Sequence, residues 1–152
     1  MSNNDFLHAT LISLGNYGVL LKGKSGLGKS DLALRLIEGN NACLVADDIV
    51  EISKEKNNIY GRAPDNLRGL LEVRGVGIVK YPYRERQKIN IAVNLVDNII
   101  ETERMPEKQQ EKILGLEIPQ IDLYAKESSA PQKILAALRL FCEYKGEKDE
   151  NV

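Results

Sequence analysis

The sequence predicts an α/β protein with a mixed β-sheet and flanking helices. Apolar strand-like segments alternate with a helical pattern in the first third of the chain, which is typical of a βαβ unit with parallel strands. A glycine-rich segment stands between the second strand and that helix. The strands predicted later in the chain have no helices between them, so the sheet is expected to be mixed and not wholly parallel.

The predicted elements of the first half begin with a strand over residues 7–14. A turn at 15–18 leads to a second strand that begins at 19–21, and a glycine-rich loop follows at 23–28. A helix is predicted over 29–38, where Leu32 and Leu36 are spaced to share one face, with Gly39 as its stop. The apolar run 42–46 is predicted to be a strand buried on both faces.

Shorter strands are predicted in the second half, at 49–52, 59–61, 89–96 and 118–124. The polar segment 54–58 is predicted to be a turn and 63–66 a loop, whereas 101–112 is expected to be exposed. Ser128 to Pro131 is a helix-start signal, so a closing helix is predicted to about Tyr144. Its apolar face would carry Ile134, Leu135, Leu138, Phe141 and Cys142.

Composition limits the kind of protein this is. The chain has 152 residues, about one domain, with 21 Lys and Arg against 22 Asp and Glu, for a net charge of −1. This balance argues against a nucleic-acid binder, and no apolar run approaches the roughly 18 residues of a membrane span. Two distant cysteines and one histidine argue against a zinc site or a disulfide framework. We expect a cytoplasmic protein with one domain over 1–145 and a charged, frayed tail over 146–152, with no signal peptide.

One segment matches the phosphate-binding pattern G-x-x-x-x-G-K-[ST] in full. It comprises Gly23, Lys24, Ser25, Gly26, Leu27, Gly28, Lys29 and Ser30. Glycines let the backbone wrap around phosphate, and the helix that follows adds the partial positive charge of its N-terminus. Lys29 is predicted to contact the β- and γ-phosphates, and Ser30 to offer its hydroxyl to Mg²⁺. The alternative, an ordinary glycine-rich turn with a solvated lysine, is disfavoured by the strand before it and the helix after it.

Asp47 and Asp48 follow the buried strand at 42–46. A helix and a turn fill the gap after Lys29, so we expect this strand to lie beside the first, with its carboxyl end near the loop. A carboxylate there can hold Mg²⁺, orient a water or accept a hydroxyl proton. Successive strand residues face opposite ways, so one Asp is expected to point into the site. A turn-forming Asp pair is the simpler alternative.

Three weaker signals have ordinary structural explanations that are at least as well supported as a functional role. Glu72 and Arg74 beside Gly75-Val76-Gly77 could form a second ligand wall, but a bulged strand explains them equally well. The lone His8 would more often be structural or solvated. Arg104 lies in a charged stretch and reads as a surface residue.

Together these motifs resemble the catalytic domain of bacterial HPr kinase/phosphorylase, a P-loop-containing kinase core. The resemblance rests on segments at 8–10, 18–21, 23–34, 44–50, 61–64 and 71–78. The segments Val45-Ala46-Asp47-Asp48 and Leu71-Glu72-x-Arg74-Gly75-x-Gly77-Ile78 are the specific ones, because the loop alone is generic.

The resemblance implies a kinase that phosphorylates a serine of the phosphocarrier protein HPr, using ATP or pyrophosphate with Mg²⁺. It implies Asp47 as the base and Ser30 and Glu72 as the Mg²⁺-linked residues. From its placement beside Asp47, we expect Asp48 to have a supporting role. His8 and Arg104 would be active-site residues, and 71–80 would serve both the kinase reaction and reverse phosphorolysis. It further implies a homo-oligomer, a hexamer in the family.

Two departures from the family pattern refine the expectation. The phosphate-loop domain begins at once, which resembles a short form without the family's N-terminal domain. The family's Pro-x-x-Pro-Gly-Arg-Asn type segment before the last helix is replaced here by 122–131, so kinase activity is favoured over phosphorolysis. Two other functions stay open at this point: a small-metabolite kinase, and a nucleotide-sensing module without turnover.

Overall fold

The computed structural model describes residues 5–146. Its two α-helices in this range are α1 (Lys29–Asn40) and α2 (Ala130–Cys142), with short 3₁₀ turns at η1 (Asp65–Leu67) and η2 (Ile99–Glu101). The strands are β1 (Asp5–Leu14), β2 (Tyr17–Lys22), β3 (Cys43–Ala46), β4 (Ile49–Glu55), β5 (Asn58–Arg62), β6 (Leu70–Val73), β7 (Gly77–Lys80), β8 (Gln87–Leu95), β9 (Gln109–Ile113) and β10 (Leu116–Leu123). The predicted α/β class with a mixed sheet is confirmed.

The main sheet is built around the long strand β1. Its first half pairs with β4 and its second half with β2 and β3, in each case antiparallel. β2 also pairs in parallel with β8, β8 in parallel with β10, and β10 antiparallel with β9. Because β4 continues through β5 back to β8, the strands β1, β4, β5, β8 and β2 close into a ring of hydrogen-bonded neighbours.

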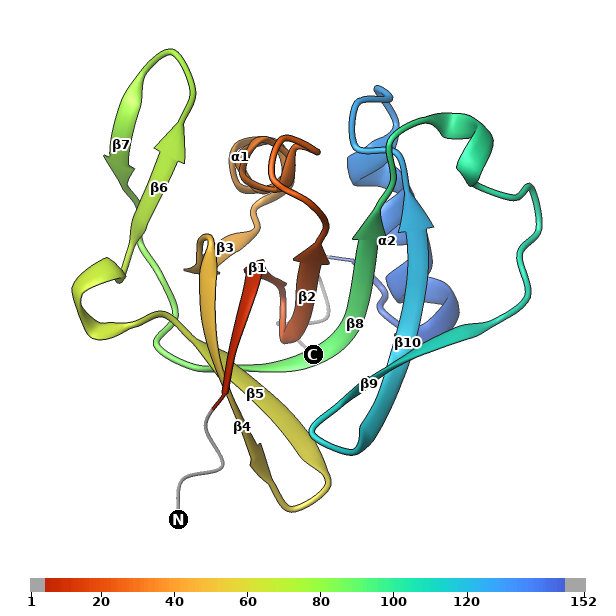
Figure 1. Ribbon diagram of the computed structural model, residues 1–152, viewed down its shortest axis with the longest axis horizontal. Coiled ribbons are helices and arrows are strands. Elements are labelled where there is room, and N and C mark those ends of the chain that lie inside the picture. The colour runs from red at the N-terminus through yellow and green to blue at the C-terminus, as the bar shows by residue number, and fades with distance from the viewer. Residues whose placement is uncertain (1–4, 147–152) are drawn as a thin grey trace.

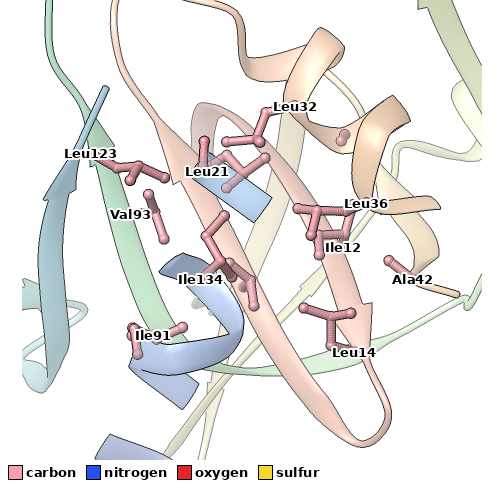
Figure 2. Close-up of a cluster of buried hydrophobic side chains, with 14 of the residues drawn as sticks. Ile12, Leu14, Leu21, Leu32, Leu36, Ala42, Ile91, Val93, Leu123 and Ile134 are labelled. Carbon is pink, nitrogen blue, oxygen red and sulfur yellow. The ribbon is translucent and has the colours of Figure 1, made fainter. Parts of the chain in front are cut away.

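Two apolar cores fill the two sides of this sheet. One lies between the sheet and the two helices, where Leu21 and Val93 of the strands meet Leu32 and Leu36 of α1 and Ile134 of α2 (Figure 2). The second lies inside the strand ring, with Leu11 and Leu20 packed against Val50 and Ile89. Each such side chain stabilises the fold by roughly 1.5–3 kcal/mol on leaving water. The edge of the sheet that carries the glycine-rich loop is therefore supported from both sides.

The connectivity corrects the prediction of a simple βαβ unit. β2 and β3 do run parallel, but β1 lies between them and pairs with both in the antiparallel sense. The sequence could not reveal this, because β1 is as apolar as a central parallel strand. The carboxyl end of β3 still lies near the loop, as expected, although β1 lies between β2 and β3.

Several element ends also differ from prediction. Gly39 does not stop the first helix, because it lies within α1, and the left-handed cap is Asn41 with φ 58°, whose N–H donates to the carbonyl of Leu36. Asparagine tolerates this conformation better than other residues with a Cβ. α2 ends at Cys142, earlier than the predicted Tyr144, and Ile134 and Leu138 of its predicted face are fully buried. The predicted tail beyond Gly146 lies outside the described residues.

The segment 70–80 is a hairpin, not a bulged strand. β6 and β7 pair only with each other, with a turn at 74–76, and the hairpin stands beside α1, apart from the main sheet (Figure 1). Leu71 is fully buried and joins the core under α1. At the base of the hairpin the hydroxyl of Tyr81 donates a 2.8 Å hydrogen bond to Glu38 of α1, which raises the pKa of Tyr81. The predicted exposed segment 101–112 is exposed, but its end forms the edge strand β9.

Candidate active site

The glycine-rich loop connects β2 to α1, as the motif predicts. Its last glycine, Gly28, is the N-cap of α1 and adopts φ 97°, a left-handed conformation that side chains with a Cβ rarely adopt. The N–H of Leu32 donates to the carbonyl of Gly28 at 2.9 Å, so the helix starts directly from the loop. The first-turn N–H groups of α1 are consequently directed at the space enclosed by the loop, which favours an anion there.

Lys29 lies inside this loop. Its ammonium donates hydrogen bonds to the carbonyl oxygens of Gly23 at 2.7 Å and Lys24 at 3.3 Å. The side chain is half-buried, which holds the charge within the loop and limits its screening by solvent. A phosphate that enters the loop would therefore meet both backbone N–H groups and a fixed positive charge.

Asp47 joins three separate elements at the end of β3. Its Oδ1 accepts a 2.7 Å hydrogen bond from the hydroxyl of Ser30 and a 3.0 Å bond from Thr10 of β1. Its Oδ2 accepts a longer, 3.3 Å bond from the backbone N–H of Glu72 on β6. The carboxylate is thus held in one orientation beside the first turn of α1.

The backbone turns sharply between Asp47 and Asp48. The N–H of Ile49 donates to the carbonyl of Asp47 at 2.8 Å, with Asp48 between them at φ 70°. This is a γ-turn with a positive φ, a rare and strained geometry that costs on the order of 1–3 kcal/mol for a residue with a side chain. The turn separates the two carboxylates: Asp47 is half-buried and hydrogen-bonded, whereas Asp48 is exposed. Only Asp47 bonds to a residue of the loop, so one aspartate enters the site as expected, but the γ-turn separates the two and strand alternation does not, because both lie beyond the end of β3.

The remaining candidates divide into those near Asp47 and one that is distant. The Glu72 side chain is exposed on β6, and its own N–H contacts Asp47. His8 is exposed on β1, opposite Ile49, and alternation places it on the strand face that carries Thr10. Arg104 is exposed in the connection between η2 and β9, which runs along the outer edge of the molecule beyond β10 (Figure 1). The structure therefore does not bring Arg104 to the group around Asp47.

Thr10 is a site residue that the sequence reasoning did not single out. It is fully buried, and its hydroxyl is bound to Asp47. The only signal was its position two residues after His8, within the segment that carried the family resemblance. A buried threonine in an apolar strand ordinarily needs a partner for its hydroxyl, and here the partner is the carboxylate.

The donor set around Ser30 fits magnesium. Among residues 5–146, no three His, Cys, Asp or Glu side chains gather as a closed metal cage would require. Mg²⁺ instead keeps several waters and uses one or two carboxylates together with substrate phosphates. The Ser30 hydroxyl, the Asp47 carboxylate at 2.7 Å from it and the nearby, exposed Glu72 are oxygen ligands of that kind.

The fold and the loop first define a class, the P-loop kinase fold, with a mixed sheet and the loop between a central strand and a helix. A family model described as the HPr serine kinase C-terminal domain matches residues 1–147. The HPr kinase/phosphorylase of Malacoplasma penetrans is 39% identical, over 78% of this chain and 43% of that protein. The HPr kinase/phosphorylase of Lactobacillus acidophilus is 34% identical, over 83% of this chain and 42% of that protein.

A solved structure agrees with these relatives. The HPr(Ser) kinase/phosphatase from Coxiella burnetii is 26% identical, with a TM-score of 0.79, over 92% of this chain and 99% of that chain. The chain belongs to the HPr serine kinase C-terminal domain family, and the resemblance found in the sequence is confirmed. This chain spans less than half of the length of each of the two curated relatives above. No helix within residues 5–146 has the length and apolar character needed to cross a membrane.

Proposed function

We propose that this chain is an ATP-dependent kinase domain that phosphorylates a serine of HPr. The observation that carries the proposal is the hydrogen bond between Ser30 of the phosphate-binding loop and Asp47 at the end of β3. It brings a carboxylate within reach of the place where the loop would present a γ-phosphate. The names of the family relatives supply the acceptor, a serine of HPr.

In the proposed reaction the serine oxygen attacks the γ-phosphorus of ATP. A bond forms between that oxygen and phosphorus, the bond from phosphorus to the β,γ-bridging oxygen breaks, and ADP leaves. Asp47 accepts the serine proton. Its Oδ1 already accepts hydrogen bonds from two hydroxyl groups. Among the contacts described, Oδ2 accepts only the long bond from the N–H of Glu72. We therefore assign Oδ2 as the oxygen that accepts the proton.

The loop residues stabilise the charge that develops during transfer. Lys29 exchanges a carbonyl partner for a phosphate oxygen and stays within the same loop. Ser30 and Glu72 are the residues that would hold Mg²⁺, with Asp47 adjacent. When bound, the ion supplies positive charge to the β- and γ-phosphate oxygens and aligns them. Thr10 holds Asp47 so that the carboxylate keeps its direction toward the loop.

The proposal includes several features for which the family resemblance is the support. His8 assists on the Asp47 side of the site, and Arg104 is included as an active-site residue on the family resemblance alone. Pyrophosphate is an alternative donor, with phosphorolysis as the reverse reaction. The protein works in the cytoplasm as a homo-oligomer, a hexamer by family resemblance.

The test is to incubate the purified chain with HPr, Mg²⁺ and γ-labelled ATP, then map the modified residue. Label on one serine of HPr is expected, and none with an HPr variant in which that serine is alanine. Label that appears only on small metabolites would replace the proposal with a metabolite kinase. Tight ATP binding without transfer to any acceptor would indicate a nucleotide-sensing module.

A further inference from the structure

The turn at residues 124–128 lies at the same edge of the sheet as the phosphate-binding loop. β2, β8 and β10 are parallel neighbours, and Lys22 and Asp122 both pair with Asn94, so their carboxyl ends lie at one level. The loop follows β2, and the turn follows β10. In open α/β sheets, ligands bind in the crevice outside the carboxyl ends of such strands.

The turn also packs against the loop itself. A Cβ on Gly28 would lie 3.5 Å from the Cβ of Ala125, an ordinary van der Waals contact. Ala125 is 3% exposed, so it is fixed in the core while its neighbours Lys126 and Ser128 are exposed. A ligand extending from the loop across the end of β8 toward β10 would reach these exposed side chains.

Arg35 on α1 holds this turn in place. Its guanidinium donates to the carbonyl oxygens of Ala125 at 2.6 Å, Glu127 at 2.9 Å and Ser128 at 3.3 Å. Several donors in a rigid, planar fork make this possible, and a lysine ammonium could not reproduce the geometry. The helix that begins at the phosphate-binding loop thus also determines the shape of the turn.

The two sides of the loop are not equivalent. Asp47 follows β3, which lies two strands from β2 in one direction, across β1. The turn follows β10, two strands from β2 in the other direction, across β8. In-line transfer places the attacking oxygen and the leaving group on opposite sides of the phosphorus. If the serine approaches beside Asp47, the leaving nucleoside diphosphate extends toward the turn.

We propose that the turn 124–128 binds the nucleoside of ATP and that Arg35 is a positioning residue for that subsite. The exposed Lys126 and Ser128 would donate hydrogen bonds to the ribose and the base. This inference rests on the proposed function for the location of the γ-phosphate, and it adds a nucleoside contact that pyrophosphate, the alternative donor, cannot make, so that ATP binds more tightly than an inorganic polyphosphate.

The test compares the binding of two ligands by calorimetry in the presence of Mg²⁺: ATP, and inorganic tripolyphosphate, which lacks the nucleoside. Wild type should bind ATP more tightly. Arg35→Lys should weaken ATP binding by about tenfold, the effect of losing one or two hydrogen bonds between the turn and the nucleoside. Tripolyphosphate binding should be unchanged. A merely structural role for Arg35 would weaken both ligands equally. Arg139→Lys, on the exposed face of α2, is the matched control and should change neither.

A second measurement does not depend on a folded variant. Wild-type protein labelled with 8-azido-ATP under light should carry the label on the peptide that contains 124–129. Label confined to the β3 or β6 segments would overturn the inference, as would equal affinities of wild type for the two ligands. Binding of neither ligand would overturn the proposed function and this inference together, whereas HPr phosphorylation with the wrong labelled peptide would overturn this inference alone.

Discussion

Ser30 and Asp47, which are 17 positions apart, share a 2.7 Å hydrogen bond between the hydroxyl and Oδ1. The bond joins the first turn of α1 to the end of β3. Because Thr10 donates to the same oxygen, the carboxylate is fixed from two elements. This geometry allows two roles for Asp47, as the proton acceptor for the serine or as a residue that orients a metal-bound hydroxyl, and the roles predict different mutant behaviour.

Asp47→Asn should reduce kcat for HPr phosphorylation by about 10²–10⁴-fold, because the amide keeps the size of the side chain but cannot take a proton. ATP affinity should change little. The measurement is a series of initial rates across Mg²⁺ concentrations. Rescue of the variant by excess Mg²⁺ would assign the residue to metal binding and contradict its role as base.

Asp48→Asn is the matched control for that experiment. Asparagine tolerates the left-handed backbone that Asp48 adopts at φ 70°, so the γ-turn should survive the substitution. Asp48 is exposed, and we expect a modest change in rate consistent with a supporting role. A collapse of activity in Asp48→Asn together with a normal Asp47→Asn would show that the two roles are reversed.

Glu72→Gln should raise the Mg²⁺ concentration needed for half-maximal rate, since an amide oxygen is a weaker ligand for a hard cation than a carboxylate. The maximal rate at saturating Mg²⁺ should recover in large part. Glu117→Gln, which changes another exposed carboxylate, on β10, serves as the control. An unchanged Mg²⁺ dependence in Glu72→Gln would remove this residue from the metal site.

The loop and Asp47 could be predicted from the sequence because each is a local signal. The pattern from Gly23 to Ser30 fixes the backbone chemistry of a strand-to-helix turn, and an aspartate that ends a buried strand has few other places to lie. The hydrogen bond from Ser30 to Asp47 then follows from the parallel directions of β2 and β3. The local signal is sufficient even though β1 was not expected between these strands.

What could not be predicted depends on contacts between distant parts of the chain. Gly39 resembled a helix stop, but α1 continues two residues beyond the predicted end at residue 38, because Asn41 can cap the helix in its place. Thr10 can hold Asp47 because β1 pairs with β3, a contact between distant parts of the chain. Arg35 reads as an ordinary surface residue of an amphipathic helix, and its three carbonyl partners lie 90 or more positions away.

Cys142 provides a prediction about pH. Burial raises the pKa of its thiol, and the positive charge of Lys88 opposes this effect in part. In a Cys43→Ser variant, the rate of alkylation by iodoacetamide should therefore rise with pH later than for free cysteine, because the thiolate is the nucleophile. The folded state holds the proton more tightly than the unfolded state, so this group's contribution to stability is lost as pH rises through its folded pKa. A titration that coincides with free cysteine would contradict the burial.

One substitution at two glycines should change stability in opposite directions. A Cβ on Gly61 of β5 would lie 2.6 Å from Cδ2 of Leu11 and 2.8 Å from Cγ1 of Val50, inside the strand ring. Gly61→Ala should therefore lower the free energy of unfolding by about 1–3 kcal/mol through overpacking. A Cβ on Gly39 of α1 meets nothing within 4 Å, so Gly39→Ala should raise that free energy by roughly 0.5–1 kcal/mol through helix propensity and a less flexible unfolded chain. Urea unfolding measures both changes in the free energy of unfolding, provided that the dependence of that free energy on urea concentration is the same in each variant as in wild type. If both variants were destabilised alike, the helix would not extend over Gly39, and if both were neutral, the strand ring would not be closely packed at Gly61.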